Sequence, residues 1–225
     1  HASGFSFNYF KNITAGEGGC FVTNDENVFE RGSVAIDPCS YYWAEEGEKT
    51  DMHGHFTAWN FRATEIAGAI LNVQLDRLEG MLAKMRHQKK VLTAAGEQCG
   101  LRPIVCHSPD YECGSHAGFI FEEEEQAVAF SEGLGEKDIK CFRPIDTGRH
   151  VYTAWDPVMK KQAAHHPALN PYLLEENQDA EADYTPGMCS RSLYILRRSA
   201  LIGTHPSWTD SRLDEVADAV RDIAK

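Results

Sequence analysis

The longest regular pattern in the sequence is an apolar stripe that begins near Ala63 and continues to about Leu92. Its apolar residues recur every three or four positions, the spacing of an amphipathic α-helix: Ile66, Ile70, Leu71, Leu75, Leu78, Leu82 and Met85. We therefore predict one helix from Ala63 that ends near Gly100, since glycine often follows a helix C-terminus. Such a helix is too long for one small core. We therefore expect the helix to run from one domain into the next, and we predict a first domain over residues 1–90 and a second over residues 91–225.

Before this helix, two short aromatic or β-branched runs bounded by glycine read as strands, over residues 4–10 and 18–25. Residues 25–34 read as a helix with Asn24 or Asp25 as N-cap. Residues 37–59 are rich in turn formers and read as a loop. Lys11 then lies on the connection between two strands, and connections carry chemistry more often than regular elements do.

After the long helix, the pattern predicts strands within residues 101–106, 116–123 and 139–145, and a helix within residues 124–134. Residues 191–203 read as two strand-like runs, and residues 210–225 as an amphipathic helix with Leu213, Val216, Ala217 and Val220 inward. Residues 146–188 read as irregular. Helices between strands predict a small α/β domain.

Composition excludes some classes of partner. Acidic residues outnumber Lys and Arg by 34 to 22, with no basic stripe, which argues against nucleic acid or an anionic membrane. No apolar run reaches the roughly 20 residues of a bilayer span. Seven cysteines without a disulfide spacing suggest reduced thiols, and we expect a soluble, cytoplasmic protein. Cys106, His107, Cys113 and His116 could converge on zinc, but their spacing matches no strong ligand signature, so we predict no metal.

The surroundings of Lys11 suggest a chemical role. A lysine amine is a poor nucleophile while protonated, but burial or nearby positive charge lowers its pKa, and the neutral amine can form a Schiff base with an aldehyde. Ser6 lies five residues earlier, and hydroxyl and N–H groups at a strand end can hold a phosphate. Pyridoxal phosphate needs this combination. A solvated surface lysine is the alternative.

Two stretches carry a family resemblance. Ser6, Phe7, Lys11 and Asn12, followed by GEGG and VTND, resemble the lysine signature of the DegT/DnrJ/EryC1/StrS sugar aminotransferases, which are fold-type I pyridoxal phosphate enzymes. Residues 59–79, which begin WNFRATE, resemble that family's second motif and its following helix. The resemblance implies an α/β fold in which residues 1–90 end the large cofactor-binding domain and residues 91–225 form the small domain.

The resemblance also implies residue roles. Lys11 would form the Schiff base with pyridoxal 5′-phosphate and shuttle the proton, and Ser6 would bind the cofactor phosphate. Asn60 would reach the partner subunit's cofactor phosphate across a homodimer interface, and Arg62 would bind a substrate carboxylate or a phosphate in the same shared site. Without the family, a helix N-cap and a surface cation are the alternatives for Asn60 and Arg62. His150, His165 and His166 could line a sugar site or be solvated or hydrogen-bonded.

The chain also departs from the family. Trp59 and Phe61 replace the usual tyrosines, the proline-rich stretch of the small domain is not recognisable, and the family's N-terminal half is absent. The chain starts at His1 on a strand, as expected for a piece of a longer polypeptide.

The expected function is transfer of an amino group from L-glutamate or glutamine to a keto-sugar, in amino-sugar biosynthesis for lipopolysaccharide, surface polysaccharide or antibiotic. The acceptor could be a nucleotide-linked keto-hexose, a keto-inositol or an 8-oxo-octulosonate on the route to 8-amino-3,8-dideoxyoctulosonate. Two alternatives stay open: a sugar dehydratase of the same fold, in which histidine replaces the lysine, and a noncatalytic sensor or interaction domain.

Overall fold

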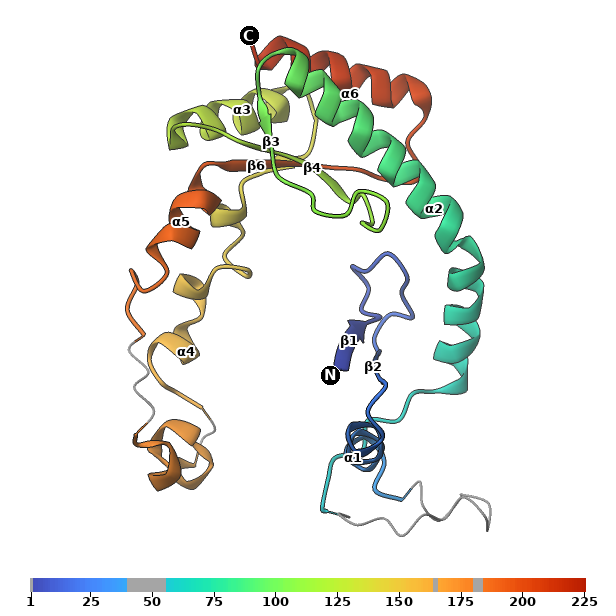
Figure 1. Cartoon of the computed structure of the whole chain (residues 1–225), viewed down its shortest axis with the longest axis vertical. Coiled ribbons are helices and arrows are strands. Elements are labelled where there is room, and N and C mark those ends of the chain that lie inside the picture. The colour runs from blue at the N-terminus through green and yellow to red at the C-terminus, as the bar shows by residue number, and fades with distance from the viewer. Residues whose placement is uncertain (1, 40–55, 164–165, 180–183) are drawn as a thin grey trace. The chain divides into compact units, whose positions relative to one another are not determined.

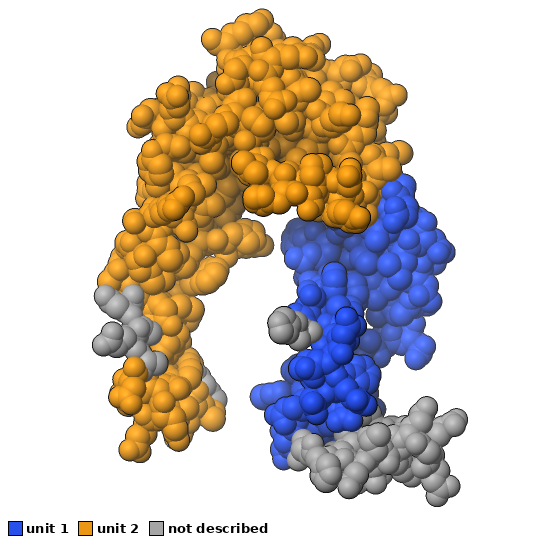
Figure 2. All heavy atoms as spheres, viewed as in Figure 1, with its two compact units in different colours: residues 1–81 blue, residues 82–225 orange. Residues whose placement is uncertain are grey.

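A computed structural model describes residues 2–39, 56–163, 166–179 and 184–225 of the chain. The chain divides into two compact units, residues 1–81 and 82–225, which are coloured separately in Figure 2. The division falls inside the long helix, close to the domain boundary that the sequence suggests. The two predicted domains, residues 1–90 and 91–225, stay a prediction.

The first unit contains a two-stranded antiparallel sheet. Strand β1 (Ala2–Ser6) pairs with β2 (Gly19–Thr23), with Ala2 opposite Thr23 and Ser6 opposite Gly19. The two predicted strands are confirmed, but the first ends at Ser6 instead of running to Phe10. The side chain of Asn8 explains this end, because its Oδ1 accepts a hydrogen bond from Phe10 N at 3.1 Å and turns the backbone away from the ladder.

Helix α1 (Glu26–Ile36) follows β2 and confirms the predicted helix. Asp25 is its N-cap, and Asp25 Oδ1 accepts from Val28 N at 3.1 Å. Gly32 lets the helix approach the sheet closely, since a Cβ there would lie 2.2 Å from the ring of Phe21 on β2. Val34 is the buried residue of this helix.

Helix α2 (Glu65–Gln98) confirms the long predicted helix. Thr64 Oγ1 accepts from Ala67 N at 3.1 Å and caps its start. Gly100, with a φ of +81°, ends it in the left-handed conformation that glycine adopts without strain. Only the second half of the apolar stripe is covered: Leu92 is fully buried, whereas Ile66 is 75% exposed.

The second unit contains a four-stranded antiparallel sheet with strand order β3-β4-β6-β5. The strands are β3 (Arg102–Pro103), β4 (His116–Ile120), β5 (Cys141–Phe142) and β6 (Ser199–Gly203).

One face of this sheet is covered by the second half of α2, by α3 (Glu124–Glu136) and by α6 (Asp210–Ile223), as Figure 1 shows. The core between them includes Leu92, Phe119, Phe130, Leu134, Ile202, Leu213, Val216 and Val220. Helix α3 and the closing helix with its inward residues are therefore confirmed.

The structure also corrects the predicted type of one element. Residues 190–197 form a helix, α5 (Ser190–Arg197), where the sequence suggested a strand. Arg143 Nη1 donates to Arg197 O at 3.2 Å, and this long-range bond satisfies a carbonyl that the helix end leaves open. A window of neighbouring residues cannot show such a partner. Strands β3 and β5 are confirmed in place but are only two residues long each.

Between β5 and α5 the described residues form only short helices, as the irregular pattern predicted: η2 (Pro144–Thr147), η3 (Tyr152–Ala154), α4 (Asp156–Met159), η4 (Pro167–Leu169), η5 (Pro171–Leu173) and η6 (Glu175–Asn177). Within the described part of the chain, no helix is long and apolar enough to span a bilayer, and no group of three or more His, Cys, Asp or Glu side chains could hold a metal ion. The mixed α/β class is confirmed.

Candidate functional site

Lys11 lies on a loop of twelve residues, 7–18, that joins β1 to β2. The base of this loop is closed by backbone bonds, from Phe7 N to Gly18 O at 2.8 Å and from Ala15 N to Phe7 O at 3.0 Å. Thr14 Oγ1 also donates to Phe7 O at 3.1 Å. The loop is therefore held at its base by three bonds to Phe7.

Asn8 and Glu17 brace the part of the loop that carries the lysine. Asn8 Nδ2 donates to Glu17 Oε1 at 2.9 Å, and Lys11 N donates to Asn8 O at 3.0 Å. The Lys11 side chain is exposed and forms no ion pair or hydrogen bond with any other residue that the structure describes. Its amine is therefore available to a ligand, while its backbone is held in place.

Ser6 is the last residue of β1 and lies on the same hairpin as Lys11. Ser6 Oγ accepts a long bond of 3.3 Å from Asn8 N, which leaves its O–H free to donate. A hydroxyl donor and a primary amine therefore stand at the same end of one hairpin. These are the two groups that a phosphate-bearing aldehyde requires, so the donor set present fits pyridoxal phosphate.

Asn60 lies in an extended segment before α2. This segment is tied to the end of α1 by a bond from Phe61 N to Ile36 O at 2.8 Å. Asn60 is exposed, and its Oδ1 accepts from Arg62 N at 3.4 Å. Since Thr64 caps α2, the role of helix N-cap is excluded for Asn60.

Arg62 forms an ion pair with Asp37, at the end of α1, with 2.9 Å between Nε and Oδ2. The arginine side chain is 53% exposed and the aspartate side chain 16%. Arg62 is therefore not a solitary surface cation. Among the residues described, no hydrogen bond or ion pair joins the Lys11 loop to Asn60 or Arg62.

Sequence reasoning identified Glu17 only as part of the motif's turn; it missed Asn8, the bond between Asn8 and Glu17, and Asp37. An asparagine directly after a strand often forms a local turn with its own backbone, and that signal could have identified Asn8. Nothing in the spacing of nine residues indicates the bond to Glu17, and Asp37 lies 25 positions before Arg62.

The loop histidines stay untested as substrate ligands. His150 is exposed, and His166 Nδ1 accepts from Ala168 N at 3.2 Å at the start of η4. His165 lies outside the described residues.

Residues 1–168 match the model of the DegT/DnrJ/EryC1/StrS aminotransferase family. Over 108 residues the chain is 32% identical to a Streptomyces kanamyceticus protein named "Putative L-glutamine:3-amino-2,3-dideoxy-scyllo-inosose aminotransferase"; the match covers 48% of this chain and 24% of that protein. It is 26% identical to the spore coat polysaccharide biosynthesis protein SpsC of Bacillus subtilis, over all of this chain and 54% of that protein. The chain thus spans about half of the length of SpsC.

Solved structures show the same fold. The structure of E. coli GDP-4-keto-6-deoxy-D-mannose-3-dehydratase with bound hydrated PLP matches 97% of this chain and 54% of that chain, with a TM-score of 0.66 at 19% identity. The structure of 3-amino-5-hydroxybenzoic acid synthase matches 99% and 54%, with a TM-score of 0.64 at 21% identity. The fold-type I class is confirmed by these structures, and the expected cofactor, pyridoxal phosphate, by the family match together with them.

Proposed function

Because the chain belongs to the DegT/DnrJ/EryC1/StrS aminotransferase family, we propose that Lys11 is the cofactor lysine of an enzyme that transfers an amino group to a keto-sugar. One observation carries the proposal. In the family-matched segment, a braced hairpin loop presents the Lys11 amine without an ion pair to any described residue, and the same hairpin carries the Ser6 hydroxyl at the end of β1.

When bound, pyridoxal phosphate supplies an aldehyde carbon that an amine can attack and a ring that accepts electrons from the substrate. Lys11 would hold that carbon through Nζ, and as a free, neutral amine it would move the proton between the amino-acid Cα and the cofactor's C4′. Ser6 would donate from its hydroxyl to the phosphate and so orient it. The bonds between Asn8 and Glu17 and between Lys11 N and Asn8 O fix the backbone from which Nζ acts.

Asn60 and Arg62 act in a site shared between two subunits of a homodimer. In the chain by itself, Trp59 is 76% exposed and Phe61 is 66% exposed, on either side of Asn60. Large exposed aromatic residues are typical of interface cores. In this arrangement Asn60 donates to the partner subunit's cofactor phosphate, and Arg62 exchanges Asp37 for a substrate carboxylate.

The amino donor is L-glutamate or L-glutamine, and the acceptor is a keto-sugar or a keto-cyclitol. Support for this substrate class comes from the names of the relatives: one is named "Putative L-glutamine:3-amino-2,3-dideoxy-scyllo-inosose aminotransferase", and another a spore coat polysaccharide biosynthesis protein. A nucleotide-linked keto-hexose or an 8-oxo-octulosonate are the further candidates, and the product would serve a polysaccharide, lipopolysaccharide or antibiotic.

A dehydratase is the alternative that the solved structures raise, since three of the similar structures are of GDP-4-keto-6-deoxymannose-3-dehydratases. Their likeness to this chain lies at or below 21% identity and concerns the fold. The residue at the reacting position favours amino transfer, because Lys11 stands where a dehydratase of this family would carry a histidine.

The test is isotope transfer by the complete protein. We expect nitrogen-15 to pass from amino-labelled glutamate, or from amide-labelled or amino-labelled glutamine, to at least one compound of a keto-sugar and keto-inositol panel. Lys11→Arg keeps the charge and should abolish transfer. Loss of a hydroxyl from the sugar without incorporation of nitrogen would establish the dehydratase, and the absence of both reactions would favour a noncatalytic domain.

A further inference from the structure

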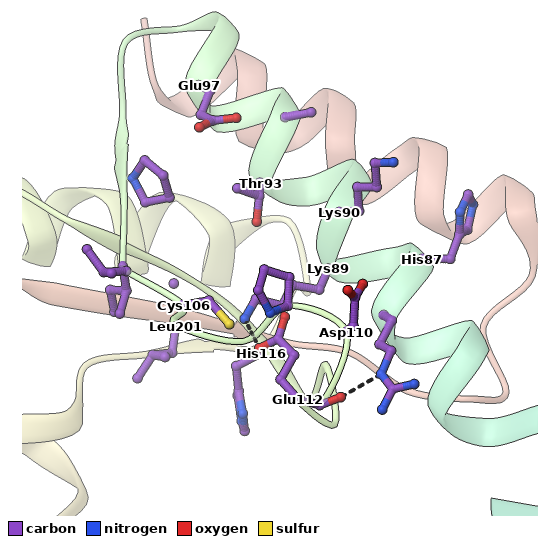
Figure 3. Close-up of a pocket in the computed structure, with 17 residues that line it drawn as sticks. His87, Lys89, Lys90, Thr93, Glu97, Cys106, Asp110, Glu112, His116 and Leu201 are labelled. Carbon is purple, nitrogen blue, oxygen red and sulfur yellow. Dashed lines mark hydrogen bonds and ion pairs between the residues drawn. The ribbon is translucent and has the colours of Figure 1, made fainter. Parts of the chain in front are cut away.

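A cavity of about 1020 Å³ lies entirely within the second unit, apart from every residue assigned to the cofactor. This volume is at the upper end of the roughly 300–1,000 Å³ of small-molecule sites. One wall is the second half of α2, the other is the segment after β3, and strands β4 and β6 form the floor (Figure 3). The charged and polar residues of the lining are Arg86, His87, Lys89, Lys90, Thr93, Glu97, Cys106, Asp110, Glu112 and His116.

Cations outnumber carboxylates at one end of this cavity. Arg86, Lys89 and Lys90 lie there on α2, against Asp110 and Glu112 on the opposite segment. Lys89 forms an ion pair with Glu112, toward which it points in Figure 3, and Arg86 Nε donates to the backbone oxygen of Glu112 at 2.6 Å. Lys90 and Asp110 form no ion pair with any residue that the structure describes. This end therefore has one more positive than negative side chain.

Beyond the cationic end, the residues that line the cavity are mostly apolar. Ile104 is 38% exposed and Val105 is 75% exposed, and together with Leu201 they give the cavity an apolar surface that nothing in this unit covers. The next carboxylate on α2 is Glu97, seven residues after Lys90, which is about 10 Å along the helix axis. Between the two ends there is room for an apolar body.

His116 lies on the floor of the cavity. Burial lowers the pKa of His116 most, and the positive charges of Lys140, outside the lining, and of Lys89 lower it further. A bound anion would offset the second contribution.

We propose that this cavity binds a small monocarboxylate with an apolar body, its anionic head among Arg86, Lys89 and Lys90 and its body against Ile104, Val105 and Leu201. The three cations and three carboxylates of the whole lining balance, but the end away from Glu97 has one excess positive charge, which matches a single negative one better than a diphosphate or a polyanion. The proposal is independent of the cofactor site.

The test measures binding of 3-phenylpropionate to the complete protein by calorimetry, with 3-phenylpropanol and phenethylamine as probes of nearly the same shape. We expect the carboxylate to bind at least about tenfold more tightly than the alcohol, because charge-assisted bonds contribute more than neutral ones, and the amine not to bind. Equal affinity for acid and alcohol, or no binding of the acid, would overturn the proposal.

Two variants of lining residues and a nuclear magnetic resonance measurement test whether the ligand binds in this cavity. Val105→Asp puts a carboxylate on the apolar wall at an exposed position and should weaken binding at least about tenfold. Lys90→Gln should weaken it about threefold, whereas Lys84→Gln, an exposed lysine of α2 outside the lining, should leave it unchanged. Nuclear magnetic resonance should show the pKa of His116 rising in the complex. Binding that neither variant weakens and that leaves His116 unchanged would assign the ligand to another surface and end the proposal.

Discussion

Asn8 and Glu17 meet across the loop that carries Lys11, with 2.9 Å between Asn8 Nδ2 and Glu17 Oε1. The bond spans nine residues of chain, and the same asparagine also accepts from the backbone N–H groups of Phe10 and Lys11. Asn8 therefore couples the conformation of the loop to the position of the lysine.

We predict that Glu17→Ala reduces cofactor attachment by about two- to fivefold at limiting pyridoxal phosphate, as expected for the loss of one exposed hydrogen bond. Glu17→Gln keeps an oxygen that can accept from Asn8 and should restore attachment. The measurement is the fraction of protein that retains the cofactor after borohydride reduction, quantified by intact mass. If glutamine and alanine at position 17 behave alike, the bond has no role in positioning Lys11.

Variants of Arg62 and Asp37 should change the interaction with glutamate in opposite directions. If Arg62 binds the donor carboxylate, Asp37→Asn releases it from its ion pair and should raise the affinity for glutamate a few-fold. Arg62→Lys keeps the charge but loses the planar pair of donors, and should weaken the glutamate half-reaction by roughly ten- to a hundredfold.

Stopped-flow measurement of each half-reaction distinguishes the possible roles of Arg62. A carboxylate-binding role predicts a smaller effect of Arg62→Lys on a keto-sugar without a carboxylate. Equal losses in both half-reactions would indicate a phosphate-binding or folding role instead. Weaker glutamate binding in Asp37→Asn would show that the ion pair supports the site.

Asn60 tests the shared site of the proposed homodimer. If Asn60 serves the partner subunit's cofactor, Lys11→Ala and Asn60→Ala are each defective alone, but a mixed dimer contains one site with both native residues. We expect co-expression of the two variants to restore about half of the native activity per heterodimer. An active monomer in light scattering, or no recovery in purified heterodimers, would contradict the shared site.

The second unit gives a prediction about stability alone. A Cβ at Gly96 on α2 would lie 2.4 Å from the ring of Phe119, which is fully buried, so Gly96→Ala should destabilise the unit by about 1–3 kcal/mol. Gly80→Ala, in the same helix but with open space around it, should be neutral or stabilising by up to about 1 kcal/mol. Urea unfolding of both variants measures the difference, and equal stability would contradict the close contact with Phe119.

The sequence predicts those elements that have a strong internal pattern. Helices α2 and α6 have apolar residues at helical spacing, and Asp25 marks the start of α1 by its capping chemistry. The sequence wrongly predicted a strand where α5 lies. The eight residues of α5 include Leu193, Tyr194 and Ile195 in succession, and so short a run has no apolar period that distinguishes a helix from a strand. The carbonyl of Arg197 at the end of α5 accepts a bond from Arg143, which lies 54 positions earlier and outside any local window.

The candidate site, too, could be predicted from the sequence only in part. Lys11 and Ser6 could be predicted because their residue types suit the chemistry and their stretch resembles the lysine signature of the family. The partners that brace or neutralise the site residues, Glu17 and Asp37, become visible only when the chain path brings them to Asn8 and Arg62. Gly16, with a φ of +88°, turns the loop just before Glu17, and no pattern of apolar residues encodes that turn.

The role of Lys11 is tested most directly by locating the covalent bond to the cofactor. The complete protein, loaded with pyridoxal phosphate and reduced with borohydride, should yield a single phosphopyridoxyl-bearing peptide in which mass spectrometry places the group on Lys11 Nζ. Lys11→Arg should bear none, even if the cofactor is still retained noncovalently. A phosphopyridoxyl group on another lysine of the wild-type protein, with Lys11 unmodified, would contradict the account.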